Sequence, residues 1–288
     1  MPIQANGTVV TSVEFNDNSV SKVFYEGNLV FPTSQKAPTA FYILPMEAGE
    51  LSFILKESTR TLSWTRPVLY YSTNNGGAYT ELKKNTPVTL QTGVPVLIKQ
   101  NSNIGFSYEQ TISGITYRES YGLHFTGKYL IGGAISSLFN GSTNIQSYGL
   151  AAFFRGETTL LFNYCNLNCY GTELYYRMFL NCSNLRNAPK FKYFNRSYMY
   201  CGMYRNCTNL ISIPSISISS LSSSTDYLFD HTFYNCPSIK FSTSQSEERP
   251  NEYLIKVTSG TAQNNFSSMF SSFTPQINTT YYTNATVI

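Results

Sequence analysis

The chain has 288 residues, of which 42% are hydrophobic, so it is long enough to bury a core in one or two domains. Charged residues make up only 12%, about half the usual share for a soluble domain, and the formal net charge of +4 is too small to indicate nucleic-acid binding by itself. The 23 Tyr and 20 Phe favour β-rich structure with a polar but uncharged surface. Such a surface is more typical of a subunit that packs in an assembly than of a free cytosolic enzyme.

Residues 1–37 are expected to form a small β-element that binds a partner. The runs Val20–Tyr25 and Leu29–Phe31 flank the turn Glu26–Asn28, in which a glycine supplies the permissive φ of a hairpin. The polar, proline-bounded stretch 32–38 is then expected to be a linker.

Residues 38–128 are expected to form a β-sandwich module. Short apolar runs alternate with turn signals such as Asn74–Gly77 and Thr92–Gly93, and this spacing is typical of sandwiches. The predicted strands are Phe41–Leu44, Leu51–Leu55, Val68–Ser72, Val88–Gln91, Pro95–Lys99 and Leu123–Thr126.

Residues 129–288 contain an internal repeat. The stretch Met178–Leu185 recurs as Met203–Leu210 after 25 residues (203 − 178 = 25) and as Thr232–Ile239 after 29 (232 − 203 = 29). Weaker copies begin at Leu138, Phe153 and Met269. A repeat of this length indicates a solenoid, in which each unit buries its apolar side against its neighbours.

Each unit of the repeat is expected to be a short helix, a turn and a short strand. An apolar residue stands four positions before each strong copy, as Leu174 does before Met178, and this spacing predicts one face of a helix. The Asn-Cys-Ser/Thr-Asn group that follows would end the helix, because short polar side chains bond to nearby backbone. The predicted core residues of the repeat are Met178, Cys182, Leu185, Met203, Cys207, Leu210, Phe233, Cys236 and Ile239.

The repeat frame resembles the BspA-type leucine-rich repeat of bacterial surface proteins and many phage structural proteins. The phrase V-x-K-V-x-Y-x-G-x-L-V-F at 20–31 resembles a short N-terminal module of tailed-phage structural proteins, and 69–79 and 125–138 resemble β-modules that precede such repeats. The resemblance implies a mixed, β-rich α+β protein with three parts: a small β-element or hairpin at 1–37, a β-sandwich module at 38–128, and a leucine-rich-repeat solenoid at 129–288.

Cysteine and histidine positions give little support for a metal site, and no cofactor is expected. All six cysteines lie in the repeat half, and three occupy the same repeat position, which favours a column of buried thiols. The pair Cys165 and Cys169 has no ligand spacing with the two histidines, His124 and His231.

An enzyme is not expected either. The carboxylates are scattered, with no spacing that indicates the facing pair of a glycosidase, and no nucleophile or phosphate-binding motif is present.

One candidate binding surface lies between Glu173 and Asp226, where basic residues alternate with tyrosines and no acid intervenes. Such a surface suits acidic sugars or an acidic partner protein; the alternative is a solvated edge of the repeat, whose tyrosines cover the apolar interior. The candidate residues are Arg177, Arg186, Lys190, Lys192, Tyr193, Arg196, Tyr200 and Arg205.

These features predict a non-enzymatic structural subunit of a tailed-phage virion, in a head fibre, a tail fibre or a capsid decoration. We expect no signal peptide at Met1–Val10 and no membrane span, which favours assembly in the host cytoplasm. Residues 1–37 would bind other virion proteins, the chain would form a homo-oligomer (a trimer by analogy with fibres), and the repeats would bind a host-surface glycan or protein. A bacterial cell-surface adhesin is the alternative, and a fibre-borne carbohydrate-active enzyme is a further one.

Overall fold

The computed structural model describes residues 39–189, 196–211, 227–238 and 268–269, and the backbone of four short strands at Val23–Tyr25, Asn28–Phe31, Ile216–Ile218 and Ile255–Val257. The first two of these strands, β1 and β2, pair antiparallel, and the last two, β13 and β14, pair parallel. The rest of the predicted 1–37 element, the linker at 32–38 and Ile239 lie outside the described residues.

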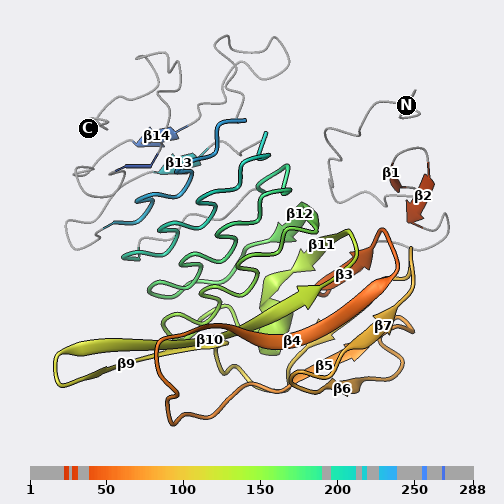
Figure 1. The fold of residues 1–288 in the computed structure, drawn as a ribbon, viewed down its shortest axis with the longest axis horizontal. Coiled ribbons are helices and arrows are strands. Elements are labelled where there is room, and N and C mark those ends of the chain that lie inside the picture. The colour runs from red at the N-terminus through yellow and green to blue at the C-terminus, as the bar shows by residue number, and fades with distance from the viewer. Residues whose placement is uncertain are drawn as a thin grey trace.

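Two larger sheets form the body of the described chain (Figure 1). The six-stranded sheet has the order β12-β11-β3-β8-β5-β6. Its strands are β3 (Tyr42–Pro45), β5 (Leu69–Ser72), β6 (Thr80–Leu82), β8 (Val96–Lys99), β11 (Tyr129–Ala134) and β12 (Leu160–Asn166). All neighbours are antiparallel except β11 and β12, which pair parallel.

The four-stranded sheet has the order β7-β4-β10-β9 and is antiparallel throughout. Its strands are β4 (Gly49–Ser58), β7 (Val88–Leu90), β9 (Ser107–Ile112) and β10 (Ile115–Phe125). Apolar residues alternate along β4, so that Leu51 and Phe53 are buried while their neighbours are not, as expected for a strand with one covered face. They share one buried cluster with Ile98 of β8 and with Phe41, which directly precedes β3.

The predicted fold class, a mixed α+β protein that ends in a leucine-rich-repeat solenoid, is wrong. The structure is β-rich with two main sheets, and the only helix in its described residues is a short 3-10 helix, η1 (Ile135–Phe139). The segments predicted as helices, such as the one that contains Leu174 and Met178, are runs of tight turns. The helix–strand unit on which the predicted repeat depended is therefore absent from the described part of the chain.

In these runs of turns, successive backbone amides alternate between a hydrogen bond within the segment and one to the next copy. The amide of Tyr176 donates to the carbonyl oxygen of Glu173 (3.1 Å), three residues back, whereas the amide of Tyr175 donates to Met199 of the next copy (3.0 Å). The alternation continues through the described copies, and every fourth residue has a positive φ. We call the four segments that do this, 148–157, 173–182, 198–207 and 227–236, the turn stack.

The spacing that predicted helices has a different cause in the turn stack. Because the backbone conformation recurs every four residues, side chains four apart face the same way, as they also do on a helix. In Figure 1 the turn segments run side by side from green to blue, starting next to β10 and β11.

The turn stack begins directly on the sheets. Amide groups of Phe106 and Leu123 donate to the carbonyl oxygens of Gly149 (2.7 Å) and Phe153 (3.1 Å) in the first turn segment. A Cβ atom at Gly122 would overlap the carbonyl of Phe153, so only glycine allows this close approach of β10. Strand β11, which follows the predicted boundary at 128, pairs with β3 on one side and β12 on the other.

Candidate functional site

The residues predicted to form a binding surface do not share one environment. Arg196 is exposed, and Arg177, Arg186 and Arg205 are half-buried. Lys190, Lys192 and Tyr193 lie outside the described residues.

Tyr200 is not on the surface that we predicted. Its side chain is fully buried, with its ring stacked on Tyr175 (centroids 5.7 Å apart) and on Phe229 (5.1 Å). Its inward direction follows from its place in the turn stack, because Tyr175 and Phe229, at the equivalent positions of the neighbouring segments, are also buried.

Two of the predicted arginines pack on tyrosines of the protein itself. The guanidinium of Arg177 lies 4.7 Å from the ring centroid of Tyr176, and that of Arg205 lies 4.9 Å from Tyr234. These are cation–π distances, so both the cations and the ring faces already have partners. The alternation of basic residues and tyrosines in the sequence therefore reflects internal packing at these positions.

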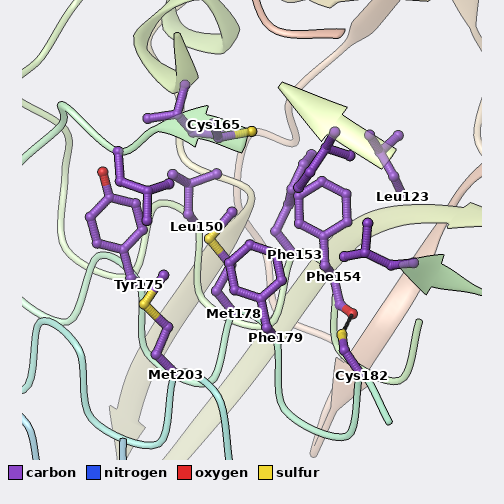
Figure 2. Packing of buried hydrophobic residues seen from close by; sticks show 14 of the residues in the cluster. Leu123, Leu150, Phe153, Phe154, Cys165, Tyr175, Met178, Phe179, Cys182 and Met203 are labelled. Carbon is purple, nitrogen blue, oxygen red and sulfur yellow. Dashed lines mark hydrogen bonds between the residues drawn. The ribbon is translucent and has the colours of Figure 1, made fainter. Parts of the chain in front are cut away.

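Buried side chains form columns inside the turn stack. Phe154, Phe179, Tyr204 and Phe233 form one aromatic column, with successive centroids 5.4, 5.2 and 5.7 Å apart and planes within 7°. Figure 2 shows Met178 and Phe179 directed into the same interior as Leu150 and Cys165. The buried members of the predicted core set are Met178, Cys182, Leu185, Met203, Cys207, Leu210, Phe233 and Cys236.

Three cysteine thiols form a second column. Cys182, Cys207 and Cys236 donate to the carbonyl oxygens of Phe154 (3.0 Å), Phe179 (3.1 Å) and Tyr204 (3.0 Å); the first of these bonds is the dashed line in Figure 2. Burial raises the pKa of all three thiols, that of Cys236 to about 12. These cysteines are therefore neutral hydrogen-bond donors and poor nucleophiles.

A buried carboxylate takes the place of this cysteine in the first turn segment, because Glu157 stands 25 residues before Cys182 (182 − 157 = 25). Its Oε1 accepts from Lys56 and from His124 Nδ1 (3.0 Å), and its Oε2 accepts from the amide of Phe125 (3.2 Å) and the hydroxyl of Tyr129 (3.2 Å). Burial alone would raise the pKa of Glu157, but His124 and Lys56 hold it below its usual value. This carboxylate thus joins the turn stack to β4, β10 and β11.

A second polar cluster lies where the β9–β10 hairpin meets the turn stack. Arg118 binds the carboxylate of Glu109 across the hairpin, through Nε (3.0 Å) and Nη2 (2.5 Å), and its Nη2 lies 3.5 Å from Glu173. The hydroxyl of Tyr148 lies 2.7 Å from Oε1 of each of these two carboxylates. Arg118 also lies 4.4 Å from the ring centroid of Tyr176. We call these five residues the hairpin cluster.

The sequence gives no signal for the hairpin cluster. Glu109 and Glu173 are 64 residues apart (173 − 109 = 64), and they meet only because the first two turn segments lie beside the hairpin. Two neighbouring carboxylates raise the question of glycoside hydrolysis, which needs such a pair around a substrate atom or a water. Here the hydroxyl of Tyr148 occupies the space between them, and Arg118 covers the same groups.

The described residues offer no other constellation typical of catalysis or metal binding. They contain no group of three or more His, Cys, Asp or Glu side chains that could hold a metal ion. The two histidines each face a carboxylate: His124 faces Glu157, and His231 lies 2.8 Å from Asp230. In the same residues no helix has the length and apolar character needed to cross a membrane.

Comparisons with known proteins give no family for this chain. No protein-family model, no curated protein and no solved structure matches it.

Proposed function

We propose that the chain is a non-enzymatic structural protein, a fibre or decoration subunit of a tailed-phage virion that presents the outer surface of the turn stack to a host glycan or protein. The observation that supports a non-enzymatic role is that the reactive side chains bind other groups of the protein itself. Thiols donate to carbonyl oxygens, buried carboxylates pair with cations, and arginines lie on tyrosine rings. Such groups stabilise a scaffold and leave little for bond-making chemistry.

The outer surface of the turn stack is itself ordered by side-chain ladders. The amide of Asn206 donates to Asn181 (2.8 Å), and that of Asn235 donates to Asn206 (3.1 Å). In a parallel ladder, Asn209 donates to Asn184 (3.0 Å). Side chains fixed in this way lose less conformational entropy when a partner binds, so a polar, amide-rich face of this kind suits adhesion to sugar hydroxyls.

The assignment to a phage virion depends on the sequence. The phrase at 20–31 resembles N-terminal modules of tailed-phage structural proteins, and the low share of charged residues, 12%, suits a subunit whose surface is covered in an assembly. Residues 1–37 would bind other virion proteins, and the chain would form a homo-oligomer, a trimer by analogy with fibres.

Immunogold electron microscopy with an antiserum against the chain tests this proposal. Gold on the heads or tails of phage particles, lost when residues 1–37 are deleted, is the expected result. Gold on the bacterial envelope in the absence of particles would overturn the proposal in favour of a cell-surface adhesin. Release of oligosaccharides from host capsule or cell-wall sugar by the purified chain would overturn its non-enzymatic part.

A further inference from the structure

The hairpin cluster contains one proton fewer than its hydrogen bonds require if both carboxylates are ionised. Tyr148 Oη lies 2.7 Å from an oxygen of Glu109 and 2.7 Å from an oxygen of Glu173. A tyrosine hydroxyl has a single proton to donate, and an ionised carboxylate can only accept. One of the two short contacts must therefore be made by a protonated carboxylic acid that donates to the tyrosine oxygen.

The position of Arg118 shows which carboxyl group holds the extra proton. Arg118 donates to one oxygen of Glu109, Oε2, from two nitrogens, and these charge-assisted bonds favour the ionised form of Glu109. Its contact with Glu173 is longer, at 3.5 Å, so Glu173 receives less compensation for its burial. The side chain of Glu173 is only 15% exposed.

We propose that Glu173 is protonated when the hairpin is docked, and that the bridge Glu173–Tyr148–Glu109 is a pH-sensitive latch that holds the β9–β10 hairpin on the turn stack. The bridge lies between the base of the hairpin, where Ser107 bonds to the carbonyl of Ala151 (2.6 Å), and its exposed end at 110–116. Loss of the proton would place two carboxylates against one hydroxyl and one shared arginine. The outer part of the hairpin would then separate from the turn stack.

The other charged and titratable groups around Glu173 support this assignment. Glu109 and Arg118 face it from the hairpin, Tyr148 from the first turn segment, and Cys201 from the third. Burial raises the pKa of Glu173 and the charge of Glu109 raises it further, whereas Tyr148 and Arg118 lower it, and the net shift is upward. The pKa of Tyr148 is also raised, chiefly by burial, so the hydroxyl keeps its own proton.

The direction of the pH effect follows from the raised pKa of Glu173. The latch is fully formed below the ordinary pKa of glutamate and is lost as the pH rises through the higher pKa that Glu173 has in the folded protein. The hairpin is thus expected to dock in mild acid and to loosen at higher pH.

Two measurements on the full chain test the latch. The first is a ¹³C NMR titration of the Glu173 carboxyl group, assigned through its own side-chain and backbone resonances, and we expect a midpoint above the ordinary glutamate range. The second is hydrogen–deuterium exchange of the peptide 107–120 at a series of pH values, normalised to the exchange rates of the unfolded peptide. Protection in the wild type is expected to fall as the pH rises.

The variant E173Q keeps a side-chain donor for the tyrosine oxygen and removes the charge, so its protection of 107–120 is expected not to change with pH. The exposed Glu81 on β6 provides the matched control E81Q, which should behave like the wild type. A Glu173 midpoint at or below the ordinary range would overturn the proposal, and so would identical pH profiles for the wild type and E173Q. The NMR titration of the wild type decides the question even if E173Q does not fold.

Discussion

Tyr204 places a hydroxyl group in the aromatic column of the turn stack, where its neighbours in the column are phenylalanines. The side chain is fully buried, and its oxygen has no hydrogen-bond partner among the residues that the structure describes. Replacement by Phe keeps the stacking with Phe179 and Phe233 and removes the unsatisfied group. Tyr204→Phe is expected to raise the free energy of unfolding by about 1 kcal/mol.

Thermal or urea denaturation of Y204F measures this effect. The converse substitution Phe179→Tyr in the same column is the control, and it should lower stability. A clear loss of stability in Y204F would show that the Tyr204 hydroxyl has a partner after all.

Glu157 is expected to make stability depend on pH in the opposite direction to Glu173. Because its pKa is lowered in the folded chain, its contribution is present above the ordinary pKa of glutamate and is lost as the pH falls through the lower folded value. Glu157→Gln leaves the buried Lys56 without a counter-ion. This substitution is expected to lower the free energy of unfolding by about 3–5 kcal/mol at neutral pH.

Urea denaturation at a series of acidic and neutral pH values checks the Glu157 prediction. The difference between wild type and E157Q should be large at neutral pH and should shrink as the pH falls. A difference that does not change with pH would contradict the role assigned to this carboxylate.

At the scale of elements, the sequence indicates where the repeats lie but not their backbone conformation. The spacing of Leu174 and Met178 fits a helix and a turn segment equally well, since both bring residues four apart to one side. One available signal distinguishes them. Asn181, Asn206 and Asn235 occupy positive-φ positions with φ of 64°, 63° and 56°, and asparagine tolerates this conformation better than most residues.

The contact between β10 and the first turn segment depends on one glycine. A side chain at Gly122 would collide with backbone at Phe153, which can move only if the hydrogen bond from the amide of Leu123 to that carbonyl breaks. Gly122→Ala is therefore expected to destabilise the chain by about 1–3 kcal/mol or more.

Chemical denaturation of G122A, with Gly77→Ala as the control, measures this effect. The nearest atom to a Cβ at Gly77 is the side-chain amide of Asn74 at 3.3 Å, which can shift. Equal stabilities of the two variants would show that β10 and the first turn segment do not pack as described.

At the scale of the whole molecule, the sheets and the turn stack share one core. Phe106 of the four-stranded sheet region packs on Phe153 of the first turn segment (centroids 4.5 Å apart), and β11 extends the six-stranded sheet to β12. Composition and turn signals locate the short strands of the β-module. The hairpin cluster and the position of Glu157 depend on contacts between residues far apart in sequence, which no local pattern records.

The central claim is that the repeats form a stack of turns with alternating hydrogen bonds. Through-hydrogen-bond NMR couplings, recorded on the deuterated, ¹⁵N,¹³C-labelled chain, test it most directly. We expect a coupling from the amide nitrogen of Phe179 to the carbonyl carbon of Met203, and one from Cys182 to Phe179. A coupling from Phe179 to Tyr175, four residues back, would instead show an α-helix and would contradict the account.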